Sequence, residues 1–92
     1  MRIPETTYEA LVRAMEQFDY GMRNTREWRD WEDNKAHKYA VKYREQRYPV
    51  KRIISLATGV SYRSFGGGAQ ANSYVRKRDL QVVRLRQENA GG

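Results

Sequence analysis

The chain has 92 residues and contains no cysteine, a single histidine and only two prolines, and its mean hydropathy is −0.98. Without cysteine, neither a disulfide framework nor a thiolate zinc site is available, and this composition fits a reducing compartment. No apolar run approaches membrane-spanning length, and the sequence begins without the apolar core of a secretory leader. We therefore expect a soluble, cytoplasmic protein that makes no membrane contact.

The length of the chain allows one small domain with an economical core. Aromatic residues make up 12% of the sequence, which together with clear periodic segments argues against disorder despite 32% charged residues. The sequence predicts a single domain over residues 1–86. A polar tail that ends in glycine follows over residues 87–92, and we expect it to fray.

Positive charge is in large excess and is unevenly distributed along the chain. The formal net charge is +7, yet residues 1–34 hold 5 Lys/Arg against 8 Asp/Glu, whereas residues 35–92 hold 13 against 3. A surface so rich in positive charge attracts polyanions. A charge that serves only solubility is the alternative, but the asymmetry within one small domain favours a binding face.

An amphipathic helix is predicted over residues 7–19. Thr6 is followed three residues later by Glu9, which is the spacing of a capping box, and Gly21 is a plausible end of the helix. Apolar residues then recur at helical spacing: Tyr8, Leu11, Val12, Met15 and Phe18. This stripe predicts a face that packs in the core.

A shorter helix is predicted over residues 25–33, after a second cap at Asn24. Its two tryptophans, Trp28 and Trp31, are three residues apart and should share a face. Two such indoles could stack on nucleic-acid bases. Core packing is the favoured interpretation, because each buried tryptophan supplies about 150–250 Å² of contact area in a protein that has few large apolar residues.

A hairpin follows, with a strand over residues 38–43 in which Tyr39, Val41 and Tyr43 alternate with polar residues. Residues 44–47 read as a polar turn, and a short return strand begins at residues 47–48. The outer face and the tip of this hairpin are cationic.

The C-terminal half predicts two further helices and a strand. Pro49 fits a helix start, and apolar residues at helical spacing extend the helix to residue 57, with Gly59 as its end. A loop over residues 60–65 leads into three glycines, which precede a helix over residues 69–77. A closing strand is predicted over residues 80–85.

This order predicts a small two-layer α+β domain, with about four helices packed on a three-stranded antiparallel sheet. The hairpin beside a basic two-helix unit is similar to a winged helix, by analogy only.

Catalysis is poorly supported by the sequence. Asp30, Glu32, Asp33 and Lys35 are superficially similar to a metal-dependent nuclease cluster, but they fall on a predicted surface helix and its exit rather than on a central strand. His37, at a strand edge, is better explained as a hydrogen-bonded structural residue than as a general base. We expect no enzymatic activity, no metal site and no cofactor.

The glycine run directly before a helix could let the backbone approach a phosphate, which the helix N-terminus would attract. A flexible turn explains the run equally well, but basic residues surround it in the sequence. The expected nucleic-acid contacts are Lys38, Lys42, Arg44, Arg47, Tyr48, Lys51, Arg52, Arg63, Gly66, Gly67, Gly68, Arg76 and Lys77. Such contacts set affinity and register without reading a base sequence.

Several short motifs together resemble a known family. Tyr48-Pro49-Val50-Lys51, Ile53-Ile54-Ser55-Leu56-Ala57, Phe65-Gly66-Gly67-Gly68 and Ala71-Asn72-Ser73-Tyr74 follow the pattern YPPK, sLA, F-GG and aN-yL. Phe18-Asp19 and His37-Lys38-Tyr39-Ala40 fit the same pattern. The chain thus resembles, over most of residues 7–85, the N-terminal head domain of ScoMcrA-type modification-dependent HNH restriction endonucleases.

The resemblance implies a non-nucleolytic accessory domain that binds DNA, rather than RNA, in restriction or defence. Three departures affect it: Val50 replaces the second proline, Gly67 replaces a serine, and Asp79 stands where the family pattern has glycine. A stand-alone domain also fits a different class, an inhibitor from a phage or mobile element (anti-restriction or anti-CRISPR) that binds a nuclease or another defence effector complex. Binding to bare duplex distinguishes the two classes.

Overall fold

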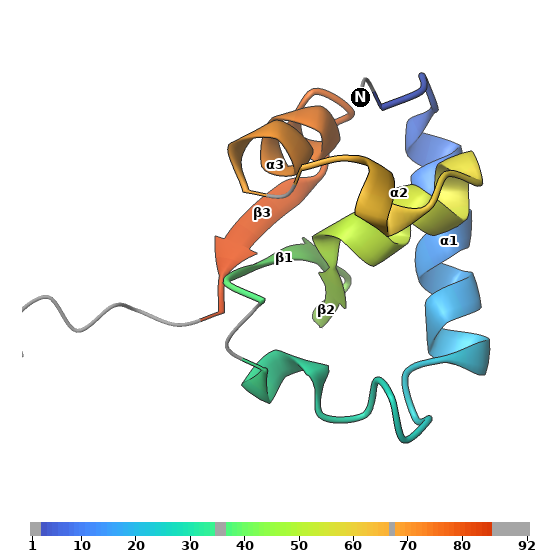
Figure 1. Cartoon of the computed structure of the whole chain (residues 1–92), viewed down its shortest axis with the longest axis vertical. Coiled ribbons are helices and arrows are strands. Elements are labelled where there is room, and N and C mark those ends of the chain that lie inside the picture. Colours follow the sequence, from blue (N-terminus) through green and yellow to red (C-terminus); the bar gives the residue numbers. More distant parts are fainter. Residues whose placement is uncertain (1–2, 35–36, 67, 86–92) are drawn as a thin grey trace, which may run out of the picture.

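The computed structural model describes residues 3–34, 37–66 and 68–85. Its elements, in chain order, are α1 (Tyr8–Gly21), a 3-10 helix (Trp31–Asp33), β1 (Tyr39–Tyr43), β2 (Gln46–Pro49), α2 (Val50–Thr58), a second 3-10 helix (Tyr62–Ser64), α3 (Ala69–Arg76) and β3 (Gln81–Arg84). Helix α1 packs on α2, α2 contacts β1, β2 and α3, and α3 packs on β3 (Figure 1).

Helix α1 forms as predicted, with a different cap. Thr7, not Thr6, is the N-cap, and its hydroxyl accepts a hydrogen bond from the amide of Ala10 at 3.1 Å. The cap and the apolar stripe act together, because the stripe buries one face of the helix while the hydroxyl satisfies an otherwise unpaired N–H group. The buried residues of α1 are Leu11, Ala14, Met15 and Phe18.

The prediction of a helix over residues 25–33 is wrong. Successive turns occupy this segment, and only Trp31–Asp33 is helical, as a 3-10 turn. Most of its backbone hydrogen bonds span three residues, as from Trp28 to Thr25 and from Trp31 to Trp28. In 3-10 geometry residues three apart lie on the same side. Trp28 and Trp31 therefore still share a face, and both are buried, at 8% and 4% exposure, which confirms the predicted core role.

The hairpin turns more tightly than predicted. Its loop is two residues long, Arg44 and Glu45, with positive φ angles of 48° and 67°. Two-residue loops with positive φ at both positions match the twist of the adjoining strands. The register pairs Tyr43 with Gln46 and Lys42 with Arg47, so residues 46 and 47, predicted to lie in the turn, belong to β2.

Helix α2 and helix α3 start where the sequence predicted. Pro49 precedes the first turn of α2, and Gly59 ends it in the left-handed conformation at φ 78°. Helix α3 begins after Gly68, whose φ of 63° favours glycine. Helix α3 ends at Arg76, one residue earlier than predicted, and Asp79 with φ 68° turns the chain into β3.

The three strands form one antiparallel sheet in the order β2-β1-β3. The α+β class with three helices on a three-stranded antiparallel sheet is confirmed. The sequence predicted about four helices, whereas the described residues form three α-helices, because residues 25–33 form mostly turns. No helix in residues 3–34, 37–66 and 68–85 is long and apolar enough to cross a membrane.

Candidate functional site

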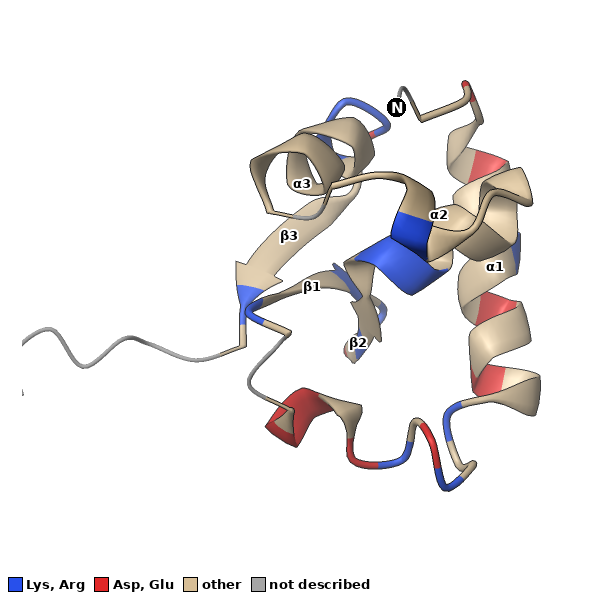
Figure 2. Cartoon of the chain, in the orientation of Figure 1, with Lys and Arg blue, Asp and Glu red and all other residues tan. Residues whose placement is uncertain are grey.

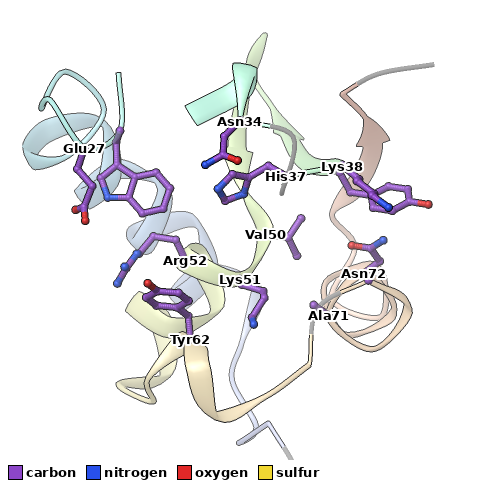
Figure 3. A pocket seen from close by; sticks show the side chains of 13 residues that line it. Glu27, Asn34, His37, Lys38, Val50, Lys51, Arg52, Tyr62, Ala71 and Asn72 are labelled. Atoms are coloured by element: carbon purple, nitrogen blue, oxygen red, sulfur yellow. The ribbon is translucent and has the colours of Figure 1, made fainter. Parts of the chain in front are cut away.

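A pocket of about 480 Å³ lies where four parts of the chain meet (Figure 3). They are the segment after α1, the start of β1, the first turn of α2 with Tyr62, and the first turn of α3. Its lining residues are Glu27, Trp28, Asn34, His37, Lys38, Tyr39, Val50, Lys51, Arg52, Tyr62, Gly68, Ala71 and Asn72. This volume lies within the range of small-ligand sites, about 300–1,000 Å³.

Both helices start at the pocket without a capping side chain. Pro49 and Gly68 are the N-cap residues of α2 and α3, and neither donates or accepts a side-chain cap hydrogen bond. The first N–H groups of an uncapped helix carry partial positive charge and lack intrahelical partners. Two such helix starts at one pocket favour an anionic group there.

Arg52 is held between two aromatic rings. Its guanidinium carbon lies 5.2 Å from the centre of the Trp28 ring and 4.4 Å from that of Tyr62. Its Nε is buried and has no hydrogen-bond partner among the described residues. The other guanidinium nitrogens are not among the fully buried atoms, so they keep donors available for an oxygen ligand. The side chain of Arg52 as a whole is only partly exposed.

Lys51 lies in the same turn of α2, with its ammonium 5.3 Å from the Phe65 ring and 5.9 Å from the Tyr62 ring. The guanidinium of Arg63 also packs on Tyr62, with its carbon 5.7 Å from the centre of the ring. None of Lys51, Arg63 or Lys38 forms an ion pair with a described carboxylate. These residues therefore add unpaired positive charge in and beside the pocket.

Asn72 is the buried polar residue of α3, at 5% exposure. Its side chain lines the pocket, and Figure 3 shows its amide directed into it. Sequence reasoning did not single out Asn72 as a site residue, although it shares the buried face of this helix with Ala71, Tyr74 and Val75. A polar residue directly inside that apolar stripe was the available signal.

The predicted hairpin residues form a second basic group outside the pocket lining. Lys42 and Arg47 face one another across the strands, which is an unfavourable pairing of like charges. Arg47 is also bonded to Glu32, with 3.3 Å between nitrogen and oxygen. Arg44 stacks on the ring of Tyr43 at 5.4 Å.

Arg76 and Lys77 form a third group, at the far end of α3. Both are exposed, and the helix separates them from Gly68 by about 12 Å, at 1.5 Å per residue. Figure 2 shows the three basic groups on α2, the strands and the turn after α3, whereas the acidic residues lie mostly on α1 and the segment that follows it. The structure thus divides the predicted contacts into three separate sets.

Tyr48 does not belong to an exposed interface. It is 3% exposed, and its hydroxyl donates a hydrogen bond to Asp19. We therefore correct its predicted role from a ligand contact to a core residue. Gly66 is exposed beside Gln70, while Gly67 and the predicted tail at residues 87–92 lie outside the described residues.

The predicted acidic surface patch contains no metal centre in the part of the chain that the structure describes. Asp30 and Asp33 are exposed, and Glu32 pairs with Arg47. His37 packs against the rings of Trp28 and Trp31, at 5.9 Å and 5.4 Å. His37 is therefore a residue of the pocket wall that packs against two aromatic rings.

Comparison with family models, with curated proteins and with solved structures gives no match for this chain.

Proposed function

We propose that this protein is a non-catalytic nucleic-acid-binding module that contacts the phosphates of duplex DNA. The observation that carries the proposal is the group of unpaired cations around the uncapped starts of α2 and α3. Together with the glycine that precedes α3, we call this group the basic pocket. It consists of Lys38, Lys51, Arg52 and Gly68, which line the pocket, and of Arg63, which packs on Tyr62 beside the lining.

Phosphate fits the basic pocket for two independent reasons. Lys51 and Arg52 supply full charges and form no ion pair with a described carboxylate. The two helix starts add N–H donors and partial positive charge at the same place. Full charges and backbone donors together are the usual means by which proteins hold a sugar-phosphate chain.

The hairpin supplies a second contact to the same polyanion. Lys42 opposite Arg47 costs stability in the free protein, because like charges lie directly across the strands. A phosphate placed between them removes that repulsion. Glu32 offsets part of the Arg47 charge at 3.3 Å, so we assign the hairpin a smaller share of the affinity than the basic pocket.

The choice of DNA and the link to restriction or defence come from the resemblance to the head domain of restriction endonucleases. The absence of catalysis is proposed from the same resemblance and from the poor candidates among the acidic residues.

A salt series tests the proposal. The affinity for a fluorescent duplex of about 20 base pairs is measured by anisotropy at several salt concentrations, for the parent and for Lys38→Gln combined with Lys51→Gln. Loss of two phosphate contacts should reduce the slope of log K against log salt by about 2 units.

The matched control is Arg13→Gln combined with Arg26→Gln, which removes the same charge from exposed positions outside the pocket lining. The control should keep the parental slope. If the parent binds no duplex even at low salt but binds a defence effector complex, the inhibitor class replaces the proposed one.

A further inference from the structure

We infer that the basic pocket accepts one unpaired nucleotide of the bound nucleic acid, with Asn72 contacting the edge of its base. This inference rests on the proposed function and names the ligand of the same site. It starts from Asn72, the polar side chain that lies inside an otherwise apolar helix face.

The amide of Asn72 is nearly enclosed by the protein but open to the pocket. Asn72 is 5% exposed and lines the pocket, and its amide atoms are not among the fully buried unpaired atoms of the described residues. An amide in this position can exchange its contacts with water for hydrogen bonds with a ligand. Asn72 therefore offers the pocket both donors and an acceptor.

The pocket has the volume and the lining that a base requires. Trp28, Tyr39 and Tyr62 contribute aromatic rings, and Val50 and Ala71 contribute apolar surface. Bases taken out of a helix are held by stacking between such side chains and by hydrogen bonds to their edges. A volume of about 480 Å³ leaves room for one base and its sugar.

The polar groups are arranged for the two halves of a nucleotide. Figure 3 shows Asn72 and Lys38 toward one end of the pocket and Arg52 with Tyr62 toward the other, with Lys51 between them. A primary amide offers one acceptor and a pair of donor hydrogens, which is the combination that reads a base edge. Lys51 and Arg52 are then available for the flanking phosphates.

A free nucleoside monophosphate carries the same chemistry as an unpaired nucleotide in a strand. We assign the site to the strand, because cations outside the pocket lining, such as Lys42 and Arg63, gain contacts only with a longer polyanion.

The experiment compares three duplexes of one sequence: fully paired, with one bulged nucleotide, and with that bulge made abasic. The bulged duplex should bind on the order of tenfold tighter than the paired one, and the abasic bulge should lose this gain. Asn72→Leu, which keeps the size of the side chain, should lose the preference and keep both the affinity for the paired duplex and the salt slope. Ser73→Ala, exposed on the same helix and outside the pocket lining, is the control.

Asn72→Leu should also melt at or above the parental temperature, because it replaces a nearly buried amide with an apolar side chain of similar size. Should it fail to fold, the side-chain amide resonances of Asn72 in the parent protein provide the readout. They should shift with the bulged duplex and not with the abasic one.

Equal binding of the bulged and abasic duplexes, or a preference that survives Asn72→Leu, would overturn the inference and leave the proposed function intact. Mononucleotides that bind as tightly as the bulged duplex would overturn the assignment to a strand. Absence of binding to all three duplexes at low salt contradicts the proposed function itself.

Discussion

Arg23 and Arg52 each lie against two aromatic rings, and their surroundings differ. Arg23 lies 5.1 Å from the Phe18 ring and 4.8 Å from the Tyr48 ring, and it also binds Asp19 at 2.6 Å. The Nη2 of Arg23 donates a hydrogen bond to the backbone carbonyl of Arg47 at 2.8 Å. Arg52 has comparable ring contacts, with no carboxylate partner in the described residues and with a buried Nε that is unsatisfied.

The difference teaches how one residue type serves two purposes. In the first group, which we call the closed cluster (Phe18, Asp19, Arg23 and Tyr48), donors meet acceptors and join the end of α1 to β2. Such a network stabilises the fold and leaves little charge for a ligand. In the basic pocket, the comparable charge forms no ion pair with a described carboxylate. This charge therefore contributes no ion pair to the stability of the fold and stays available to a ligand.

Trp28→Ala should have the largest effect, because this ring contacts both groups: Phe18 of the closed cluster at 5.6 Å and Arg52 of the basic pocket at 5.2 Å. We expect a loss of about 3–5 kcal/mol in the free energy of unfolding, which is enough to unfold a marginal small domain. Urea denaturation followed by circular dichroism measures it. A variant that melts like the parent and only loses nucleic-acid binding would contradict the core role of Trp28.

Tyr48→Phe should cost about 1.5–3 kcal/mol, because it leaves a carboxylate, Asp19, without the hydroxyl that donates to it. Burial, and then this hydrogen bond, raise the pKa of Tyr48 from 10.0 to about 12. The folded state therefore favours the neutral phenol, and this contribution is complete below pH 10 and is lost as the pH rises toward 12.

The pH dependence provides the measurement for Tyr48. The parent should lose stability more steeply than Tyr48→Phe between pH 10 and 12. Tyr20→Phe, at a position that is 97% exposed, is the control and should follow the parent. Parallel curves for the parent and Tyr48→Phe would show that the Asp19 contact does not stabilise the neutral phenol.

Arg23→Met and Arg52→Met form a matched pair that tests the comparison directly. Methionine keeps an apolar stem against the rings and removes the charge. Arg23→Met should lose about 1–3 kcal/mol, because it breaks a charge-assisted bond with Asp19 and a bond with the backbone. Arg52→Met should change stability by less than about 1 kcal/mol, since no hydrogen bond to its Nε is lost.

Duplex affinity should respond in the opposite order, with a marked loss for Arg52→Met and little change for Arg23→Met. Thermal melting and anisotropy on the same samples measure both quantities. Equal losses of stability in the two variants would remove the distinction between the closed cluster and the basic pocket.

Lys42→Glu should have the smallest effect on stability. It converts the repulsive pair with Arg47 into an attractive one, and we expect a gain of about 0.2–1 kcal/mol. The same change should weaken duplex binding less than the loss of Lys51, because the hairpin carries the smaller share of the affinity. A larger loss than for Lys51→Glu would move the main interface to the hairpin.

Local patterns in the sequence predicted much of the fold. The apolar spacing after Pro49 identified α2, and the alternation in residues 38–43 identified β1, because burial of one face enforces these periods. The segment at residues 25–33 was mispredicted for a tertiary reason. Its two tryptophans are held in the core by contacts with Phe18 and His37, and turns satisfy those contacts without a continuous helix.

The candidate site was less accessible from the sequence. The cations of α2 and the glycine at Gly68 were identified, since charge and helix starts are local features. That Arg52 lies between Trp28 and Tyr62, and that Asn72 is directed into the same pocket, depends on packing between segments far apart in the sequence. Asp19 and Tyr48 both belong to the motifs on which the family resemblance is based. The hydroxyl of Tyr48 donates a hydrogen bond to Asp19, so these two motif residues stabilise the fold rather than contact a ligand.

The placement of the two tryptophans has a spectroscopic consequence. Trp28 lines the basic pocket against Arg52, whereas Trp31 is buried outside the pocket lining with an indole N–H that has no acceptor among the described residues. Trp31→Phe removes that unsatisfied donor and keeps an aromatic ring, which makes it a mild substitution. The resulting protein emits from a single indole at the wall of the pocket. Its fluorescence then reports occupancy of the pocket directly, without a label on either the protein or the DNA.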